Sequence, residues 1–435
     1  MVIRSISGNG LRRALGLAIL PGMLLATLPA LAGPPVTLGA AQFDAPDPAS
    51  GWKVTLTKGG MLFQKEFPPD EDNRRKGVAV IQVSGPVSAT PDDFDRNYQT
   101  VVGGVDGMAE ERPMRKSDGV TVNGHRIRSD FRCCVSVKGV SVGQRTVGIG
   151  SDTSQMMLAF ITLGLRGEAE DAAAADFAAL VRSLKLSADD KGFELIAREG
   201  DGGLDGVFTH LDTGLRPNAF GGTDFFSEST VTVFDPSGLY ATEIPRGGDI
   251  QAHCRAEPTD CGLYALKEGG LLSAPKSIEM RAVADDIGTI ESETKPFMQD
   301  GDDLVIDEGE YARLPPFAEG TTFSGTWRYF FASSGSTAVS SGSVASERIL
   351  TLGDDGTFTR TGWSGTSGSN ETGNGNVGFT TSAKRPAASG RYEVEGYGIT
   401  LTGEDGATER LSLFAPDGDS DKLLVIDGSN YLKQD

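Results

Sequence analysis

Two segments of the chain share one pattern: an apolar run, an acidic turn, a tyrosine and a cation. They are LVIDEGEYAR at Leu304–Arg313 and LVIDGSNYLK at Leu424–Lys433. Their separation of about 120 residues is too long for a solenoid unit and suits a small domain. The sequence therefore predicts that the later half of the chain is one β-module present twice.

Further segments repeat with nearly the same offset. They are Gly206–Phe208 with Gly325–Trp327, Val231–Tyr240 with Ile349–Phe358, and Cys261–Tyr264 with Ser389–Tyr392. The middle pair has β-forming runs on both sides of a glycine-bearing turn, which predicts a hairpin. We find no helical periodicity in either copy. We expect two small antiparallel β-barrels or sandwiches, at residues 204–315 and 322–435, which hide their edges by closing.

The first residues predict export. Three arginines and no acid precede an apolar stretch at residues 14–28, and Ala30-Leu31-Ala32 has the small-x-small form of a signal peptidase site. The apolar run is shorter than the roughly 20 residues of a membrane span, and Pro21 interrupts it. We therefore expect residues 1–32 to be a cleaved signal peptide and the protein to be periplasmic or secreted, rather than anchored by this segment.

The charge balance narrows the choice of partners. Sixty acidic residues against forty Lys and Arg give a formal net charge of −20. Such a surface repels nucleic acids and anionic membranes. No later segment is apolar over the length of a membrane helix. We expect no nucleic-acid partner and no integral membrane segment after cleavage.

The four cysteines form two pairs in the sequence. Cys254 and Cys261 enclose a polar stretch and predict a disulfide that closes a short loop in an oxidising compartment. A metal pair with the adjacent His253 is the alternative, but a zinc site needs about four ligands. Cys133 and Cys134 are neighbours in an expected strand, where their side chains would point to opposite faces. We therefore expect that they do not readily bond each other. They either stay reduced, with one thiol buried and one partly exposed, or form a vicinal bridge, and a redox switch is the less favoured role.

Residues 41–187 form a unit of mixed α and β character. A helix is predicted from Thr90-Pro-Asp-Asp93, where Thr90 can cap and Pro91 suits the first turn. Phe94, Tyr98 and Val102 would form its apolar stripe. Asn123-Gly124 predicts a hairpin. A second helix, Glu168–Leu186, is expected to close the unit after strands at 126–138, 140–148 and 156–163.

This order of paired strands, helix, antiparallel meander and terminal helix resembles the PsbP-like α/β/α sandwich of exported bacterial proteins. The resemblance rests on element order and covers about one third of the chain. Members of that group are mostly binding or assembly proteins. The resemblance therefore implies a binding role and no active site in this unit.

The same unit carries a locally basic tract, whose members are Arg112, Arg115, Lys116, Arg126, Arg128, Arg132 and Lys138. It could dock an acidic partner or the chain's own acidic domains. We favour the simpler interpretation that these cations line the solvated faces of strands.

The start of the last repeat, Ser324-Gly-Thr-Trp327, resembles the opening Gly-x-Trp of lipocalins. In that family the tryptophan plugs the closed end of the barrel. The resemblance implies that Trp327, and Phe208 in the earlier copy, form the barrel floors. Both copies are shorter than a usual lipocalin and lack its helix before the last strand. The resemblance therefore implies a lipocalin-like barrel, either with a ligand cavity or filled by its own side chains.

Two segments within the last repeat, residues 332–346 and 364–390, are rich in Ser, Gly, Thr and Asn. Their apolar content is too low to offset the entropy of ordering. We expect mobile loops, as filler rather than as contacts for a ligand or glycan.

No catalytic machinery is visible in the sequence. His125, His210 and His253 are the only histidines, and none has a sequence sign of a nucleophile and an orienting acid. Acidic turns at Asp300–Asp307 and Asp417–Asp421 lack calcium-loop spacing and are expected to be solvated turns. We predict no catalytic, cofactor or metal site.

Three function classes follow. The favoured class is an exported, non-catalytic binding or envelope-associated protein for a small molecule, glycan or envelope protein. A structural or scaffolding protein with filled barrels is the alternative. A hydrolase without a linear motif is the third.

Overall fold

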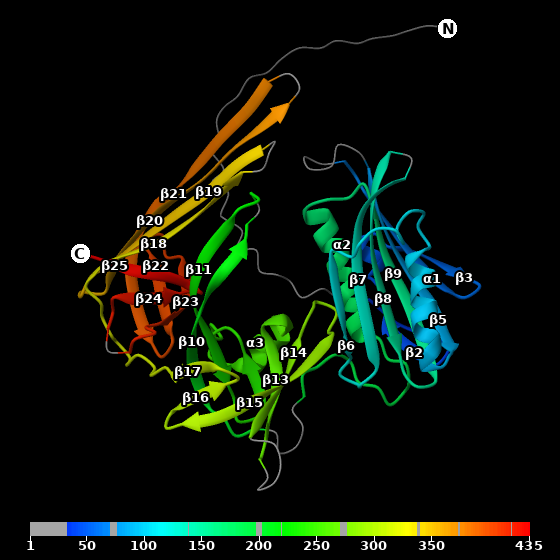
Figure 1. Cartoon of the computed structure of the whole chain (residues 1–435), viewed down its shortest axis with the longest axis horizontal. Coiled ribbons are helices and arrows are strands. Elements are labelled where there is room, and N and C mark those ends of the chain that lie inside the picture. Colours follow the sequence, from blue (N-terminus) through cyan, green and yellow to red (C-terminus); the bar gives the residue numbers. More distant parts are fainter. Residues whose placement is uncertain are drawn as a thin grey trace, which may run out of the picture. The chain divides into compact units, whose positions relative to one another are not determined.

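A computed structural model describes residues 33–69, 76–137, 139–196, 202–218, 220–269, 276–336, 340–372, 375–418 and 420–435. The predicted signal peptide lies outside these residues. An N-terminal α+β part is followed by two closed, eight-stranded antiparallel barrels (Figure 1). The predicted fold class is therefore confirmed. Among the described residues, no helix is long and apolar enough to cross a membrane.

The N-terminal part is an antiparallel sheet with the strand order β6-β7-β8-β9-β5-β4-β3. A two-stranded sheet of β1 (Pro35–Leu38) and β2 (Ala41–Asp44) precedes it. The larger sheet consists of β3 (Lys53–Thr57), β4 (Gly60–Phe67), β5 (Gly77–Ser88), β6 (Arg115–Val120), β7 (Arg126–Val137), β8 (Val140–Gly150) and β9 (Ser154–Leu163).

Two helices cover opposite faces of this sheet. α1 (Phe94–Val102) buries its apolar stripe with Met157 of β9. α2 (Glu168–Ser183) packs in the core that contains the next residue of β9, Leu158. Successive strand residues point to opposite faces, so the two helices lie on opposite sides. The N-terminal part therefore has the layer order helix, sheet, helix.

Both helices begin where the sequence predicts. The Thr90 N–H donates to Asp93 Oδ2 at 3.0 Å, and a short 3-10 turn, η2 (Pro91–Asp93), leads into α1. The second helix ends three residues before the predicted Leu186. Lys185 has left the helix there and forms a backbone bridge with Gln42 of β2.

The structure confirms one cysteine prediction and corrects the other. Cys254 and Cys261 form a disulfide with a Cα–Cα distance of 5.5 Å, within the usual range. Cys133 and Cys134 are also bonded to each other, so the vicinal bridge is the alternative present, against the expectation that neighbours in a strand do not readily bond. The register of β7 against β8 shifts between Arg132 and Val135. Both cysteines lie in this bulge, where simple alternation of side chains does not apply.

The first barrel closes because β10 pairs with β17 and β14 with β15. Its strands are β10 (Gly206–Pro217), β11 (Thr223–Phe234), β12 (Leu239–Ala241), β13 (Cys261–Lys267), β14 (Ser277–Val283), β15 (Ile290–Asp300), β16 (Asp303–Ile306) and β17 (Gly309–Arg313). A helix, α3 (Ile250–Ala256), precedes β13, although the sequence predicted no helix here. Its seven residues span about two turns, too few to show a period. The Asp249 side chain caps it by accepting from the Gln251 N–H.

The second barrel closes because β18 pairs with β25. Its strands are β18 (Gly325–Ser336), β19 (Ser340–Leu352), β20 (Thr357–Thr372), β21 (Gly375–Glu395), β22 (Gly398–Gly403), β23 (Thr408–Phe414), β24 (Leu423–Ile426) and β25 (Ser429–Gln434).

The described parts of the Ser- and Gly-rich segments are strands, so the prediction of mobile loops is wrong there. β18 to β21 continue past the barrel as four long paired strands (Figure 1). Pairing satisfies their backbone groups without a large apolar core. Hydroxyls also pair across strands, at 2.8 Å between Ser341 and Ser369 and between Ser343 and Ser367.

A buried tyrosine ties the entry segment to a hairpin turn in each barrel. The Tyr264 hydroxyl lies 2.9 Å from the Leu204 N–H, which donates to it, and 2.9 Å from the carbonyls of Leu204 and Asp235. The second barrel repeats this arrangement with the Tyr392 hydroxyl, the Phe323 N–H at 2.7 Å, and the carbonyls of Phe323 and Gly353. The two barrels therefore share an internal arrangement as well as a topology.

The repeated LVID segments also match in backbone conformation. Asp307 and Asp427 end them with φ values of 58° and 49°, and they are the non-glycine residues with positive φ among those described. A short polar side chain tolerates this left-handed conformation. The shared acid of the two segments is thus explained by the turn.

We expect Tyr264→Phe and Tyr392→Phe each to lower the free energy of unfolding by roughly 1–3 kcal/mol, because buried backbone groups lose their partner. Urea denaturation of each variant measures this. Tyr329→Phe is the control, since the Tyr329 hydroxyl makes no hydrogen bond among the described residues and contacts Tyr431 through its ring. An equal loss in the control would contradict the assignment.

Candidate functional site

The interior of each barrel is filled by its own side chains. Phe208 is 1% exposed and packs edge-on against Phe234, and Trp327 is fully buried. The Trp327 Nε1–H donates to the Asp421 carbonyl at 2.7 Å, and Lys433 Nζ lies 4.9 Å from the ring. Both candidate floor residues thus lie in barrel interiors, in corresponding surroundings. The two cores also contain Tyr240, Tyr264, Ile278 and Leu304 in the first barrel, and Leu352, Tyr392, Ile399 and Leu424 in the second.

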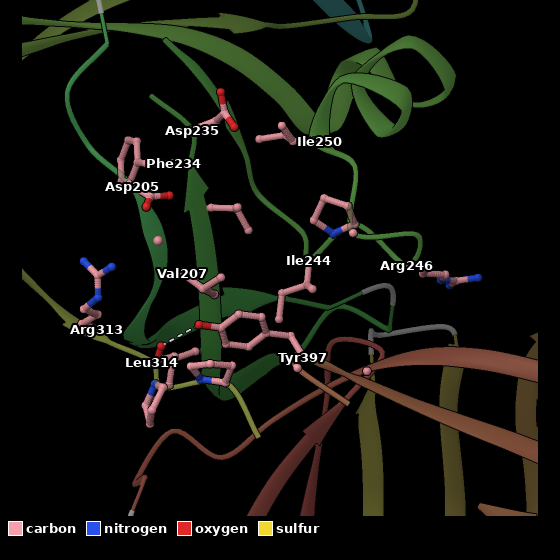
Figure 2. A pocket seen from close by; sticks show the side chains of 18 of the residues that line it. Asp205, Val207, Phe234, Asp235, Ile244, Arg246, Ile250, Arg313, Leu314 and Tyr397 are labelled. Atoms are coloured by element: carbon pink, nitrogen blue, oxygen red, sulfur yellow. Dashed lines mark hydrogen bonds between the residues drawn. The ribbon is translucent and has the colours of Figure 1, made fainter. Parts of the chain in front are cut away.

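A cavity of about 1490 Å³ lies where the two barrels meet (Figure 2). The first barrel contributes the apolar side chains of Val207, Ile244 and Leu314. The second contributes Tyr397, whose hydroxyl donates to the Leu314 carbonyl at 2.7 Å. The tyrosine therefore joins the two walls of the cavity, and burial raises its pKa.

A cluster of apolar side chains holds these walls together. Phe414 and Val425 of the second barrel are 3% and 0% exposed and pack with Val207 and Leu314 of the first. An ion pair of 2.7 Å joins Arg246 Nη2 to the Asp427 carboxylate at the edge of this contact. The cavity is therefore bordered by a packed interface.

The cavity also contains charged groups of both signs. Its guanidinium groups belong to Arg246, Arg313 and Arg410, and its carboxylates to Asp205, Asp235, Asp302, Asp303 and Glu395. Among the described residues, neither Arg313 nor Arg410 has an ion-pair partner. The Arg313 guanidinium lies over the Phe208 ring at 5.4 Å. Both guanidinium groups have N–H donors available for a bound molecule.

The three histidines lie elsewhere. His125 Nε2 is 2.8 Å from Asp190 Oδ2. His210 stacks on Tyr311 at 4.8 Å between ring centroids. His253 Nε2 is buried without a hydrogen-bond partner in the described part of the chain. None of them lines the cavity between the barrels. The structure brings no two of the candidate histidines together.

His125 instead helps to bind the connector that follows α2. Asp190 Oδ2 accepts from His125 and from the Leu186 N–H at 2.7 Å, while Asn123 Oδ1 accepts from the Lys191 N–H at 2.9 Å. Burial would raise the pKa of the Asp190 carboxyl, but the hydrogen bonds from His125 and the Leu186 N–H lower it overall. The predicted turn at Asn123-Gly124 thus anchors the connector.

Three members of the basic tract, Arg126, Arg128 and Arg132, pair with nearby acids. The Arg128 guanidinium binds Asp118 at 2.6 Å and Asp95 at 2.7 Å. The buried Arg132 pairs with Asp130 at 3.0 Å. Lys138 lies outside the described residues. These contacts favour a structural role for the tract over docking of an acidic partner.

A cation outside that tract reaches the first barrel. Arg145 of β8 pairs with Asp286 at 2.7 Å, and the Ser117 hydroxyl donates to Asp285 at 2.5 Å. Sequence reasoning did not identify Arg145 as a contact residue, because a single cation in a strand forms no recognisable pattern.

The acidic turns serve the fold. Asp303 Oδ1 accepts from the Arg313 N–H at 2.8 Å, and Asp421 pairs with Lys433 at 2.6 Å. Asp419 lies outside the described residues. Within the described ranges, no group of three or more His, Cys, Asp or Glu side chains could hold a metal ion.

No protein-family model and no curated protein matches this chain. The cavity residues come from loops and strand ends of both barrels, including the segment Leu314–Pro316 that joins them. No local motif could have indicated them, because only the packing of one copy on the other brings them together.

We expect Asp190→Asn to lower the free energy of unfolding near pH 7 by roughly 1–3 kcal/mol, because charge-assisted hydrogen bonds to Asp190 are lost. The folded-state pKa of Asp190 is lowered. Its contribution is therefore present above the unfolded value of about 3.9 and is lost as the pH falls through the folded value. Thermal unfolding from pH 2 to 7 measures this. A wild-type and variant difference that stays constant below pH 4 would contradict it.

Proposed function

We propose that the protein is an exported, non-catalytic binding protein whose ligand site is the cavity between the two barrels. The observation that carries this proposal is a large cavity with an apolar wall and two guanidinium groups, Arg313 and Arg410, free of ion pairs among the described residues. Binding sites commonly combine an apolar lining with a few convergent polar groups.

The filled barrels favour this site over a lipocalin-type one. Side chains such as Trp327 and Tyr264 occupy the barrel interiors, where a lipocalin-like ligand would lie. The cavity at the interface offers Val207, Ile244 and Leu314 to an apolar part of the ligand. The ligand would thus bind between the outer surfaces of the two barrels and not inside either barrel.

The dimensions and charges indicate the kind of ligand. The volume exceeds the ~300–1,000 Å³ typical of small-molecule pockets. Guanidinium groups suit a carboxylate, sulfonate or phosphate, while the neighbouring carboxylates suit hydroxyl or ammonium donors. The site therefore fits an extended amphiphilic molecule or a peptide segment that carries polar groups along an apolar body.

Other features support export and a binding role. The segment at residues 1–32 has the pattern of a signal peptide, and both cysteine pairs are oxidised, as in proteins from oxidising compartments. His125 and His210 are engaged in contacts between segments of the chain. The resemblance of the first unit to PsbP-like proteins points the same way.

A scaffolding role is the second candidate, and the filled barrel interiors favour it. In that case, the cavity would be a by-product of barrel packing. Native mass spectrometry of protein purified from its host periplasm separates the two. A co-purifying adduct supports binding, and an empty protein supports scaffolding.

We expect the amphiphilic dye 1-anilinonaphthalene-8-sulfonate to bind the cavity, with its rings on the apolar wall and its sulfonate near Arg410. Arg410→Ala should weaken binding by about tenfold, the effect of losing one charge-assisted hydrogen bond. Fluorescence titration measures the Kd. Arg360→Ala is the matched control, because Arg360 lies in the same barrel and pairs with Glu409 outside the cavity.

If the proposal is right, Arg410→Ala raises the Kd of the dye and Arg360→Ala leaves it unchanged. Equal Kd values for wild type, Arg410→Ala and Arg360→Ala would place the dye elsewhere and remove the support for this site. Leu215→Arg should be titrated in parallel, since exposed apolar residues on the β10–β11 hairpin are a separate place for the dye.

A further inference from the structure

The β10–β11 hairpin extends beyond the first barrel as a two-stranded ribbon. β10 pairs with β17 only at Phe208 and Thr209, and β11 pairs with β12 only at Val233 and Phe234. The two strands remain paired with each other as far as Pro217 and Thr223. Residues 210–217 and 223–232 therefore have no other strand partner among the described pairings.

The ribbon has one uncharged face and one charged face. Cross-strand register places Leu211 opposite Ser229, Thr213 opposite Ser227, and Leu215 opposite Phe225 on one face. The other face carries Asp212, Arg216, Asp224 and Glu228. Such alternation is typical of a strand pair whose apolar face packs against another protein surface.

That apolar face is largely uncovered in the single chain. Leu211, Leu215 and Phe225 are 60%, 72% and 69% exposed. At the base of the ribbon, the same face is covered, since Val207 and Val233 pack against the second barrel. The uncovered part is thus continuous with a surface that already forms an interface.

Contacts to the second barrel keep the ribbon in place. The Asn430 Nδ2–H donates to the Ser227 carbonyl at 3.2 Å, and the Asn218 Nδ2–H to the Ser334 carbonyl at 2.9 Å. In Figure 1, the ribbon runs beside β18 and β25. Leu432 of β25 and Phe330 of β18, 59% and 52% exposed, add two apolar side chains from the neighbouring outer wall.

Leu211, Leu215 and Phe225 form an apolar patch on the ribbon, and Phe330 and Leu432 flank Arg328 on the neighbouring wall. The Arg328 guanidinium lies over the Phe330 ring at 5.0 Å and pairs with Glu347. A free side chain of this size exposes on the order of 200 Å², so the five apolar side chains together expose roughly 600 Å² of apolar surface. With the intervening Thr and Ser residues, it approaches the ~800 Å² that each partner buries in a standard interface.

The absence of charge on the ribbon face and its continuity with the contact between the barrels favour a second copy of the chain as the occupant. A protein of net charge −20 repels its own copies, but this face carries no charged side chain on the ribbon.

We propose that two copies of this chain associate through the apolar face of the β10–β11 ribbon and the neighbouring Phe330 and Leu432. The dimer is isologous, so each copy covers the patch of the other. This site is separate from the cavity between the barrels, and neither requires the other.

Sedimentation velocity over a concentration series tests the proposal. We expect wild-type protein to be dimeric, with a Kd of about 1 µM or lower. Leu215→Arg and Phe225→Glu, made separately, should each raise the Kd by roughly 30-fold or more. Because these substitutions have opposite charges, a shared effect reflects loss of apolar contact. Both side chains are exposed in the single chain, so the melting temperature extrapolated to low concentration should change little.

Leu56→Arg is the matched control, since Leu56 is 75% exposed on β3, far from the ribbon in sequence. It should leave the Kd unchanged. A wild-type monomer at tens of micromolar would overturn the proposal, as would a dimer that both ribbon variants leave intact. A wild-type monomer that binds neutral lipid vesicles, with binding lost in Leu215→Arg, would assign the patch to lipid and also overturn it.

Discussion

The contact between the two barrels is the interaction on which the proposed sites depend. Val207 and Leu314 of the first barrel pack on Phe414 and Val425 of the second, with almost no exposed area. This apolar contact brings Tyr397 to the Leu314 carbonyl and creates the walls of the cavity. It also covers the base of the β10–β11 ribbon, so the rest of the ribbon lies along the outer wall of the second barrel. Burial of these apolar side chains stabilises the contact between two modules that would otherwise be independent.

The two copies keep the same interior and differ on the outside. The tyrosine contacts, the left-handed aspartates and the cation over the floor aromatic occur in both. The outer positions do not match, since Val207 corresponds to Thr326 in the second copy. If the two modules had identical outer faces, the surface that forms the contact would be present on both and would tend to bind further copies. Different outer faces give one defined contact and leave a cavity beside it.

Sequence reasoning succeeded where a local rule applied. The capping residues at Thr90 and Asp93 and the stripe at four-residue spacing predicted α1, and repeated segments predicted two modules of short strands. It failed where pairing partners decide the outcome. The Ser- and Gly-rich segments become strands because four of them satisfy each other's backbone, and Cys133 and Cys134 meet because a bulge interrupts the alternation. The short helix α3 shows no periodicity over its length.

The sequence by itself determined the module pattern, the helices of the first unit, the Cys254–Cys261 disulfide and the burial of Phe208 and Trp327. These features depend on neighbouring residues in the chain or on a repeat that can be recognised in the amino-acid sequence. Only the tertiary structure decided that the barrels are filled, that a cavity lies between them and that one hairpin face is left uncovered. Those features depend on which outer surfaces contact each other. Val207 and Val425 are far apart in the sequence, and no sequence pattern predicts that they pack together.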